Sequence, residues 1–142
     1  MKIFVSQIYT EPRVSYPFSH HFQKFLSEEL TSRVVPSDTF AQKYGRHFHL
    51  VFNVSAKADI IQPESKGPTV FKKDKDVEFT IFLTYNKRHS RGEEMYRAVL
   101  RQLLDEVVDV LKSLQIDVSQ VIRDRDNIVE RIVADPKMIA RD

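Results

Sequence analysis

The sequence predicts an α+β domain in which a mainly antiparallel sheet of three or four strands carries helices on one face. Several short segments alternate apolar and polar residues, whereas others repeat apolar residues at helical spacing. These segments follow the order β-α-β-β-β-α-α, which is typical of helices gathered on one side of a sheet. The 142 residues fit one domain, 1–142, with a flexible tail after about residue 135.

The beginning of the chain is expected to form a strand followed by an amphipathic helix. Lys2 to Tyr9 concentrates β-forming residues without helical spacing, which predicts a strand near the centre of the sheet. Ser15 and Pro17 provide a helix start. The apolar residues that follow recur at helical spacing and define one face of this helix: Phe18, Phe22, Phe25, Leu26 and Leu30.

The middle of the chain is expected to supply the remaining strands. Arg46 to Val54 and Val77 to Tyr85 alternate apolar and polar residues, which is typical of antiparallel strands with one solvated face. Thr69 to Lys72 is predicted to be a short strand that turns into the second of these segments. The two remaining segments, Val35 to Gly45 and Lys57 to Pro68, are expected to be long loops.

The C-terminal third is predicted to be helical. Ser90 and Glu93 have the spacing of a capping box and precede a leucine- and valine-rich segment that ends near Leu114. Ile116 to Ser119 combines weak helix formers with capping residues, so the helix is expected to break there. A second helix should then run from about Ser119 to about Val133.

The apolar faces of these elements define the predicted core, because their positions share faces at the correct period. It comprises Ile3, Val5, Phe22, Leu26, Phe48, Leu50, Phe52, Phe79, Ile81, Leu83, Val99, Leu103, Val107 and Leu111.

Composition excludes several classes of function. The chain has no cysteine, so thiol nucleophiles, disulfides and thiolate zinc sites are absent. Its three glycines lie far apart, which argues against a glycine-rich phosphate loop and a nucleotide cofactor. The net charge of +2 is too small to indicate nucleic acid by itself. With no signal peptide and no long apolar segment, the expected location is the cytoplasm.

Histidines offer the main candidate for metal chemistry. His47 and His49 are two residues apart on one strand face, and such a pair can chelate zinc. No motif supplies a third ligand, so we interpret them as solvated histidines and expect neither a metal nor another cofactor. Because no nucleophile or acid–base constellation is recognisable either, the chain is predicted not to be an enzyme. A histidine-dependent metal hydrolase stays the lesser alternative.

A nucleic-acid-binding module is the main alternative. Lysines and arginines flank the Val77 to Tyr85 strand, and Phe71 and Phe82 lie near enough for base stacking. However, Asp74, Asp76 and Glu78 dilute this positive charge. Lysines beside a strand also protect sheet edges from aggregation, so protein binding is favoured over RNA binding.

Three stretches carry a resemblance to a known family: the opening Met1-Lys-Ile-Phe-Val-Ser6, the segment Lys66 to Tyr85, and the long helix running to Leu114-Gln-Ile-Asp117. In this order of elements the chain resembles small immunity proteins of bacterial polymorphic toxin systems, including contact-dependent growth inhibition. The resemblance implies a non-enzymatic cytoplasmic protein that binds and neutralises a cognate toxin domain. It assigns no functional residue, because contact surfaces in such proteins diverge with the toxin.

A partner is expected on the sheet face opposite the helices, where Phe82 is an aromatic anchor among polar residues. An equal alternative is that the C-terminal helix or tail covers Phe82. The predicted partner-binding residues are His47, His49, Asn53, Glu78, Thr80, Phe82 and Thr84, bordered by Tyr44 and Arg46. The next candidate surface is the acidic side of the helices, around Asp105, Asp109, Asp124 and Glu130.

Overall fold

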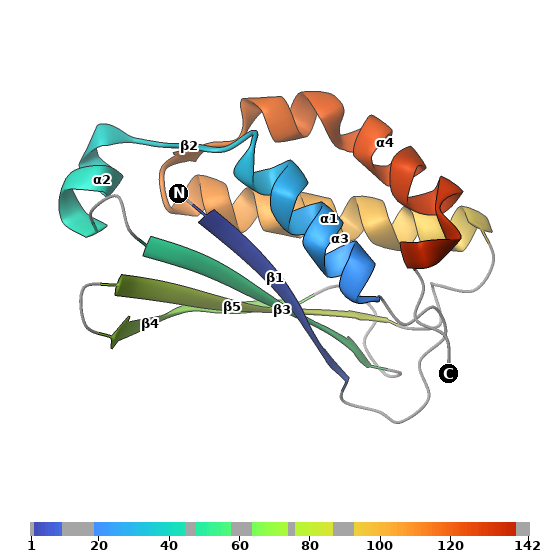
Figure 1. The fold of residues 1–142 in the computed structure, drawn as a ribbon, viewed down its shortest axis with the longest axis horizontal. Helices are drawn as coiled ribbons and strands as arrows, with labels where there is room; N and C mark the ends of the chain where they lie inside the picture. Colours follow the sequence, from blue (N-terminus) through green and yellow to red (C-terminus); the bar gives the residue numbers. More distant parts are fainter. Residues whose placement is uncertain are drawn as a thin grey trace.

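The chain folds into a sheet with a layer of helices on one side (Figure 1). A computed structural model describes residues 2–9, 19–44, 48–57, 64–73, 76–86 and 93–138. The elements are β1 (Lys2–Tyr9), α1 (His20–Thr31), β2 (Val35–Pro36), α2 (Asp38–Tyr44), β3 (Phe48–Lys57), β4 (Glu64–Lys73), β5 (Asp76–Asn86), α3 (Glu93–Ser113), β6 (Ile116–Asp117), α4 (Ser119–Ala134) and the 3-10 helix η2 (Pro136–Met138).

The large sheet is mainly parallel, so the predicted antiparallel sheet is wrong. Its strand order is β1-β3-β5-β4, in which β1, β3 and β5 run parallel and β4 alone is antiparallel to its neighbour β5. Alternation along a strand shows that one face is covered, but it does not show the direction of the neighbouring strand. Here α1 and α2 provide the long crossover that lets β3 return parallel to β1.

Strand β1 also lies at an edge of the sheet and not near its centre. Its early position in the chain and its β-forming residues did not determine how many neighbours it has. The two-stranded pairing of β2 with β6 was not expected either, nor was the helix α2. The strands β2 and β6 and the helix α2 all lie in or beside segments in which proline and short polar residues indicate loops.

Segments predicted as loops contain regular structure because local hydrogen bonds support it. Ser37 precedes α2 and caps it, since its Oγ accepts a hydrogen bond from the Phe40 amide at 3.1 Å. The predicted loop 57–68 contains the first half of β4, whose register with β5 shifts between Lys66 and Thr69. This irregularity accommodates Pro68 on an edge strand, where a missing amide donor is tolerated.

The boundaries of the two C-terminal helices agree with the sequence, whereas α1 begins later than predicted. Residues 10–18 lie outside the described residues, so the predicted start at Ser15 and Pro17 is not described. Helix α1 begins at His20, and the Oγ of Ser19 caps it by accepting a hydrogen bond from the Phe22 amide at 3.1 Å. The break before Ser119 is confirmed, because β6 separates α3 from α4. Residues 139–142 also lie outside the described part, so the flexible tail stays a prediction.

The core lies between the sheet and the helices and confirms twelve of the fourteen predicted core residues. The side chains of Phe48 and Leu83 lie outside the described part of the chain. Helix α4 adds an apolar face that the prediction did not include, namely Val121, Ile128, Val129 and Ile132. In Figure 1, α1, α3 and α4 all lie on the same side of the sheet. No helix among the described residues covers its opposite face.

An ion-pair network joins α1 to α4. The Nε of Arg33 donates to Asp124 at 2.8 Å, and its Nη1 bonds Glu29 on the last turn of α1. Arg131 of α4 reaches the same Glu29 at 2.6 Å and lies 4.8 Å from the ring centre of Phe25. These contacts fix α1 against α4 and therefore help to set where α1 meets the sheet.

The Asp124 ion pairs should make stability depend on acid pH. Hydrogen bonds from Arg123 and then Arg33 lower the pKa of Asp124 to about 2, against about 3.9 in an unfolded chain. A lowered folded-state pKa means that the stabilisation is present above about pH 4 and is lost as the pH falls to about 2. Urea unfolding should therefore show the stability gap between wild type and Asp124→Asn shrinking over this range. A constant gap would contradict the prediction.

One residue after α3 adopts a conformation that glycine favours. Gln115 has a φ of 59°, the left-handed geometry common just past a helix C-terminus. The left-handed conformation costs a non-glycine residue about 1–2 kcal/mol in stability. The greater backbone entropy that glycine loses on folding partly offsets the advantage of glycine at this position. Gln115→Gly should therefore raise the free energy of unfolding by about 0.5–1 kcal/mol in denaturant titrations. Gln102→Gly, within α3, is the control and should lower it by about 1 kcal/mol.

Candidate functional site

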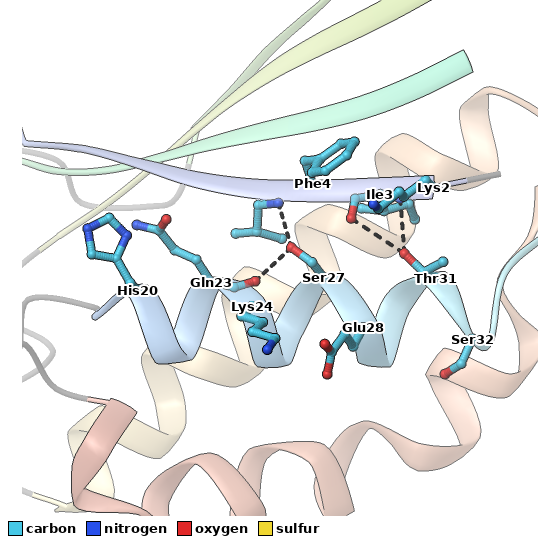
Figure 2. A pocket seen from close by; sticks show the side chains of 11 residues that line it. Lys2, Ile3, Phe4, His20, Gln23, Lys24, Ser27, Glu28, Thr31 and Ser32 are labelled. Carbon is cyan, nitrogen blue, oxygen red and sulfur yellow. Dashed lines mark hydrogen bonds between the residues drawn. The ribbon is translucent and has the colours of Figure 1, made fainter. Parts of the chain in front are cut away.

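Helix α1 closes the free edge of β1 with two side-chain hydroxyls (Figure 2). The amide of Ile3 donates to Thr31 Oγ1 at 3.0 Å, and the amide of Val5 donates to Ser27 Oγ at 2.8 Å. The hydroxyls are four residues apart on a helix, about 6 Å, and the amides are two residues apart on a strand, about 6.6 Å. The two spacings match well enough for both bonds to form, with α1 running antiparallel to β1.

The apolar stripe of α1 determines which of its side chains meet the strand. Phe22, Leu26 and Leu30 are buried in the core and fix the rotation of the helix about its axis. The neighbouring stripe, which contains Ser27 and Thr31, is thereby turned toward the edge of β1. The hydroxyl of Ser27 also donates to the carbonyl of Gln23 at 2.6 Å, which holds it in place.

A groove of about 560 Å³ runs along this junction of α1 and β1. Its lining combines the strand edge with the polar stripe of the helix: Lys2, Ile3, Phe4, Val5, His20, Gln23, Lys24, Ser27, Glu28, Thr31 and Ser32. Figure 2 shows α1 on one side of β1 and the Phe4 side chain projecting from the other. Phe4 therefore connects the groove to the sheet face that lies opposite the helices.

Phe4 is a partly exposed aromatic residue held by two neighbours. Phe4 is 37% exposed to solvent. Its ring centre lies 5.2 Å from that of His49 on β3, with the rings tilted by 42°. The ammonium of Lys2 lies 4.9 Å from the Phe4 ring centre, within the range of a cation–π contact. The Phe4 ring is thus partly exposed to solvent while His49 and Lys2 hold it in place.

Strand register places most of the predicted partner-binding residues in rows across the sheet. Because paired residues point to the same face, the positions in each row share the face opposite the helices. The rows are Lys2, His49 and Glu78; Phe4, Val51 and Thr80; Ser6, Asn53 and Phe82; and Ile8, Ser55 and Thr84. The side chains of Asn53, Glu78, Phe82 and Thr84 lie outside the described part, as do Arg46 and His47 altogether.

Two predicted partner-binding residues differ from expectation. Thr80 is only 5% exposed, so its expected display on the surface is wrong. As a central residue of β5 it has neighbouring strands on both sides, in Val51 and Thr69. Tyr44 packs on Phe79, with ring centres 4.7 Å apart, and Phe79 is a core residue on the helix side. Tyr44 therefore borders the helix side of the sheet.

The acidic surface proposed as the next candidate is largely occupied by internal ion pairs. Asp105 accepts from Arg125 at 2.7 Å, and Glu130 accepts from Arg97 at 2.7 Å. Asp124 binds Arg33, as described above. Because these carboxylates already have cationic partners, this surface offers a partner less charge than its sequence indicates.

The sequence interpretation missed Phe4 and the groove. The alternation in β1 places Ile3 and Val5 toward the helices and therefore Lys2 and Phe4 on the opposite face. That signal was available. The polar stripe of α1 was interpreted as a solvated face because its sequence does not show that a strand edge lies beside it.

Three further observations concern metal binding, an unpartnered ring nitrogen and membrane insertion. Among the residues described, no three His, Cys, Asp or Glu side chains gather in a group that could hold a metal ion. The buried Nδ1 of His49 has no hydrogen-bond partner within that part of the chain. No described helix combines the length and apolar character needed to cross a membrane.

No protein-family model matches the chain, and neither a curated protein nor a solved structure matches it. The site is therefore characterised by its geometry and chemistry.

Removing one edge hydroxyl should destabilise the fold. Thr31→Val keeps the shape of the side chain but leaves the Ile3 amide without its acceptor, at a cost of about 1–2 kcal/mol in unfolding free energy. Thr39→Val, on the exposed surface of α2, is the matched control and should change it by less than about 0.5 kcal/mol. Equal effects of the two substitutions in urea titrations would contradict the role assigned to Thr31.

Proposed function

We propose that this chain is a non-enzymatic immunity protein that binds and neutralises a protein toxin domain in the cytoplasm. The resemblance of its sequence to immunity proteins supplies the class of partner. One structural observation supports a docking role: Phe4 is exposed on a sheet face opposite the helices and is supported by His49 and Lys2. The proposed interface is centred on Phe4 and is called the Phe4 surface below.

The Phe4 surface has the properties of a binding hot spot. An aromatic ring offers a large contact area, and few rotatable bonds must be fixed when a partner binds. The stacking on His49 and the cation–π contact with Lys2 restrict the ring before any partner arrives. Less conformational entropy is then lost on association, which favours affinity.

The surroundings of Phe4 extend this surface in two directions. Val51 lies beside Phe4 across the strand pair and is half-buried, so an apolar centre continues onto β3. On the other side the groove begins, with lysine, glutamine and glutamate side chains around it. An apolar centre with a polar rim is the usual anatomy of a protein–protein interface.

Truncation of Phe4 should weaken neutralisation without unfolding the protein. Phe4→Ala removes an anchor worth about 2 kcal/mol, which corresponds to an affinity loss of about 30-fold for the toxin domain. If the adjacent upstream reading frame ends in a small toxic domain, that domain is the one to use. Co-expression with the wild-type chain should restore growth, whereas the variant should rescue poorly, and calorimetry should give the loss in affinity.

The matched control is Ile122→Ala, which truncates another exposed apolar residue, 54% exposed and located on α4. It should keep both rescue and affinity. Melting temperatures of both variants should stay close to that of the wild type, since neither side chain is in the core. Failure of the wild-type chain to rescue, with no complex on a sizing column, would overturn the immunity function. Full affinity in Phe4→Ala would remove the Phe4 surface from it.

A further inference from the structure

We infer that the groove between α1 and β1 binds an acidic, extended segment of the partner, with an apolar residue of that segment against Phe4. This inference rests on the proposed function and names the part of the partner that the groove takes. It depends on three properties of the groove: two lysines that form no ion pair among the described residues, its closed strand edge and its continuity with Phe4.

The charges of the groove favour a negatively charged occupant. Lys2 and Lys24 both line it, and neither forms an ion pair within the described residues. The described arginines of α4, by contrast, are all engaged with aspartate or glutamate. Glu28 is the one carboxylate among the described residues of the lining. Among the described lining residues, the ammonium groups of Lys2 and Lys24 thus outweigh the one carboxylate, although the Lys2 ammonium also contacts the Phe4 ring.

The closed edge of β1 determines how an occupant is recognised. The amides of Ile3 and Val5 are already bonded to Thr31 and Ser27, so an entering peptide cannot pair with them as an added strand. Recognition must instead come from side chains, through the ammonium groups, the Gln23 amide and the Phe4 ring. Carboxylate side chains of the occupant satisfy the lysines, because ammonium groups bind carboxylates by charge-assisted hydrogen bonds.

The size and ends of the groove fit a short segment. Its volume of about 560 Å³ lies within the range of about 300–1,000 Å³ that is typical of ligand sites. Lys2 and Phe4 come from the strand, while Lys24 comes from the middle of α1 (Figure 2). The two lysines thus belong to opposite walls, with the aromatic ring beside one of them. An occupant with alternating acidic and apolar residues matches this arrangement.

The test uses a model peptide, so it does not require the toxin. The probe is acetyl-Glu-Leu-Glu-Leu-Glu amide, titrated into the isotope-labelled full chain and followed by NMR. We expect the amide signals of Gln23, Lys24 and Ser27 to shift, with those of α4 unchanged. The same peptide with glutamine in place of glutamate should bind at least about threefold more weakly, as loss of exposed ion pairs predicts.

Charge reversal in the protein provides the complementary comparison. Lys24→Glu should weaken acidic-peptide binding about threefold to tenfold, because an attraction becomes a repulsion. Lys112→Glu, an exposed lysine at the end of α3, is the matched control and should leave it unchanged. The same pair of variants is then tested for toxin affinity, where Lys24→Glu should again be the weaker binder.

Each contrary result identifies what has failed. No shift with the acidic peptide, or equal shifts with the glutamine peptide, overturns the acidic occupant. A single-stranded oligonucleotide that binds the groove more tightly than the peptide would assign the lysines to nucleic acid instead. Full toxin affinity in Lys24→Glu, with growth rescue retained, would overturn this inference and leave the proposed function intact. Failure of the wild-type chain to rescue growth would overturn the proposed function and the identity of the partner, whereas the peptide titration would still decide whether the groove takes an acidic segment.

Discussion

The architecture depends on the need to satisfy the outer edge of β1, the first strand of a mainly parallel sheet. An edge strand exposes amide and carbonyl groups that other chains can pair with. Here α1 fills that role, since Ser27 and Thr31 accept the hydrogen bonds that a neighbouring strand would otherwise accept. The helix must therefore lie beside β1 as well as above the core, and this double position creates the groove.

The elements predicted from periodicity are largely correct, because burial of one face leaves a strong trace in the sequence. The bounds of β1 and the break between α3 and α4 follow from local residue types. The helix faces that contain the buried residues Phe22 and Leu103 follow from them as well. The direction of the strands does not leave such a trace. Whether β3 runs with or against β1 is decided by the crossover through α1 and α2, and α2 itself was interpreted as a loop.

The candidate site could be predicted only in part, for a similar reason. Alternation placed His49 and Glu78 on one face of the sheet, and their pairing between β3 and β5 agrees with that placement. The aromatic residue that the structure shows on that face is Phe4, from a strand that the sequence places in the sheet without indicating its neighbours. A groove formed by a helix and a strand is a tertiary feature, so neither segment contains a motif for it.

The two hydroxyl contacts of α1 also limit how far a helix can follow a strand. A helix advances about 6 Å in four residues, whereas a strand advances about 6.6 Å in two. Each further pair of helix side chain and strand amide is therefore offset by about 0.6 Å more than the pair before it. Strand twist adds an angular divergence. After Thr31 and Ser27, the next position on this stripe is Gln23, whose longer side chain lines the groove. Because the two repeats differ, side-chain hydrogen bonds from α1 cannot continue along the whole edge of β1.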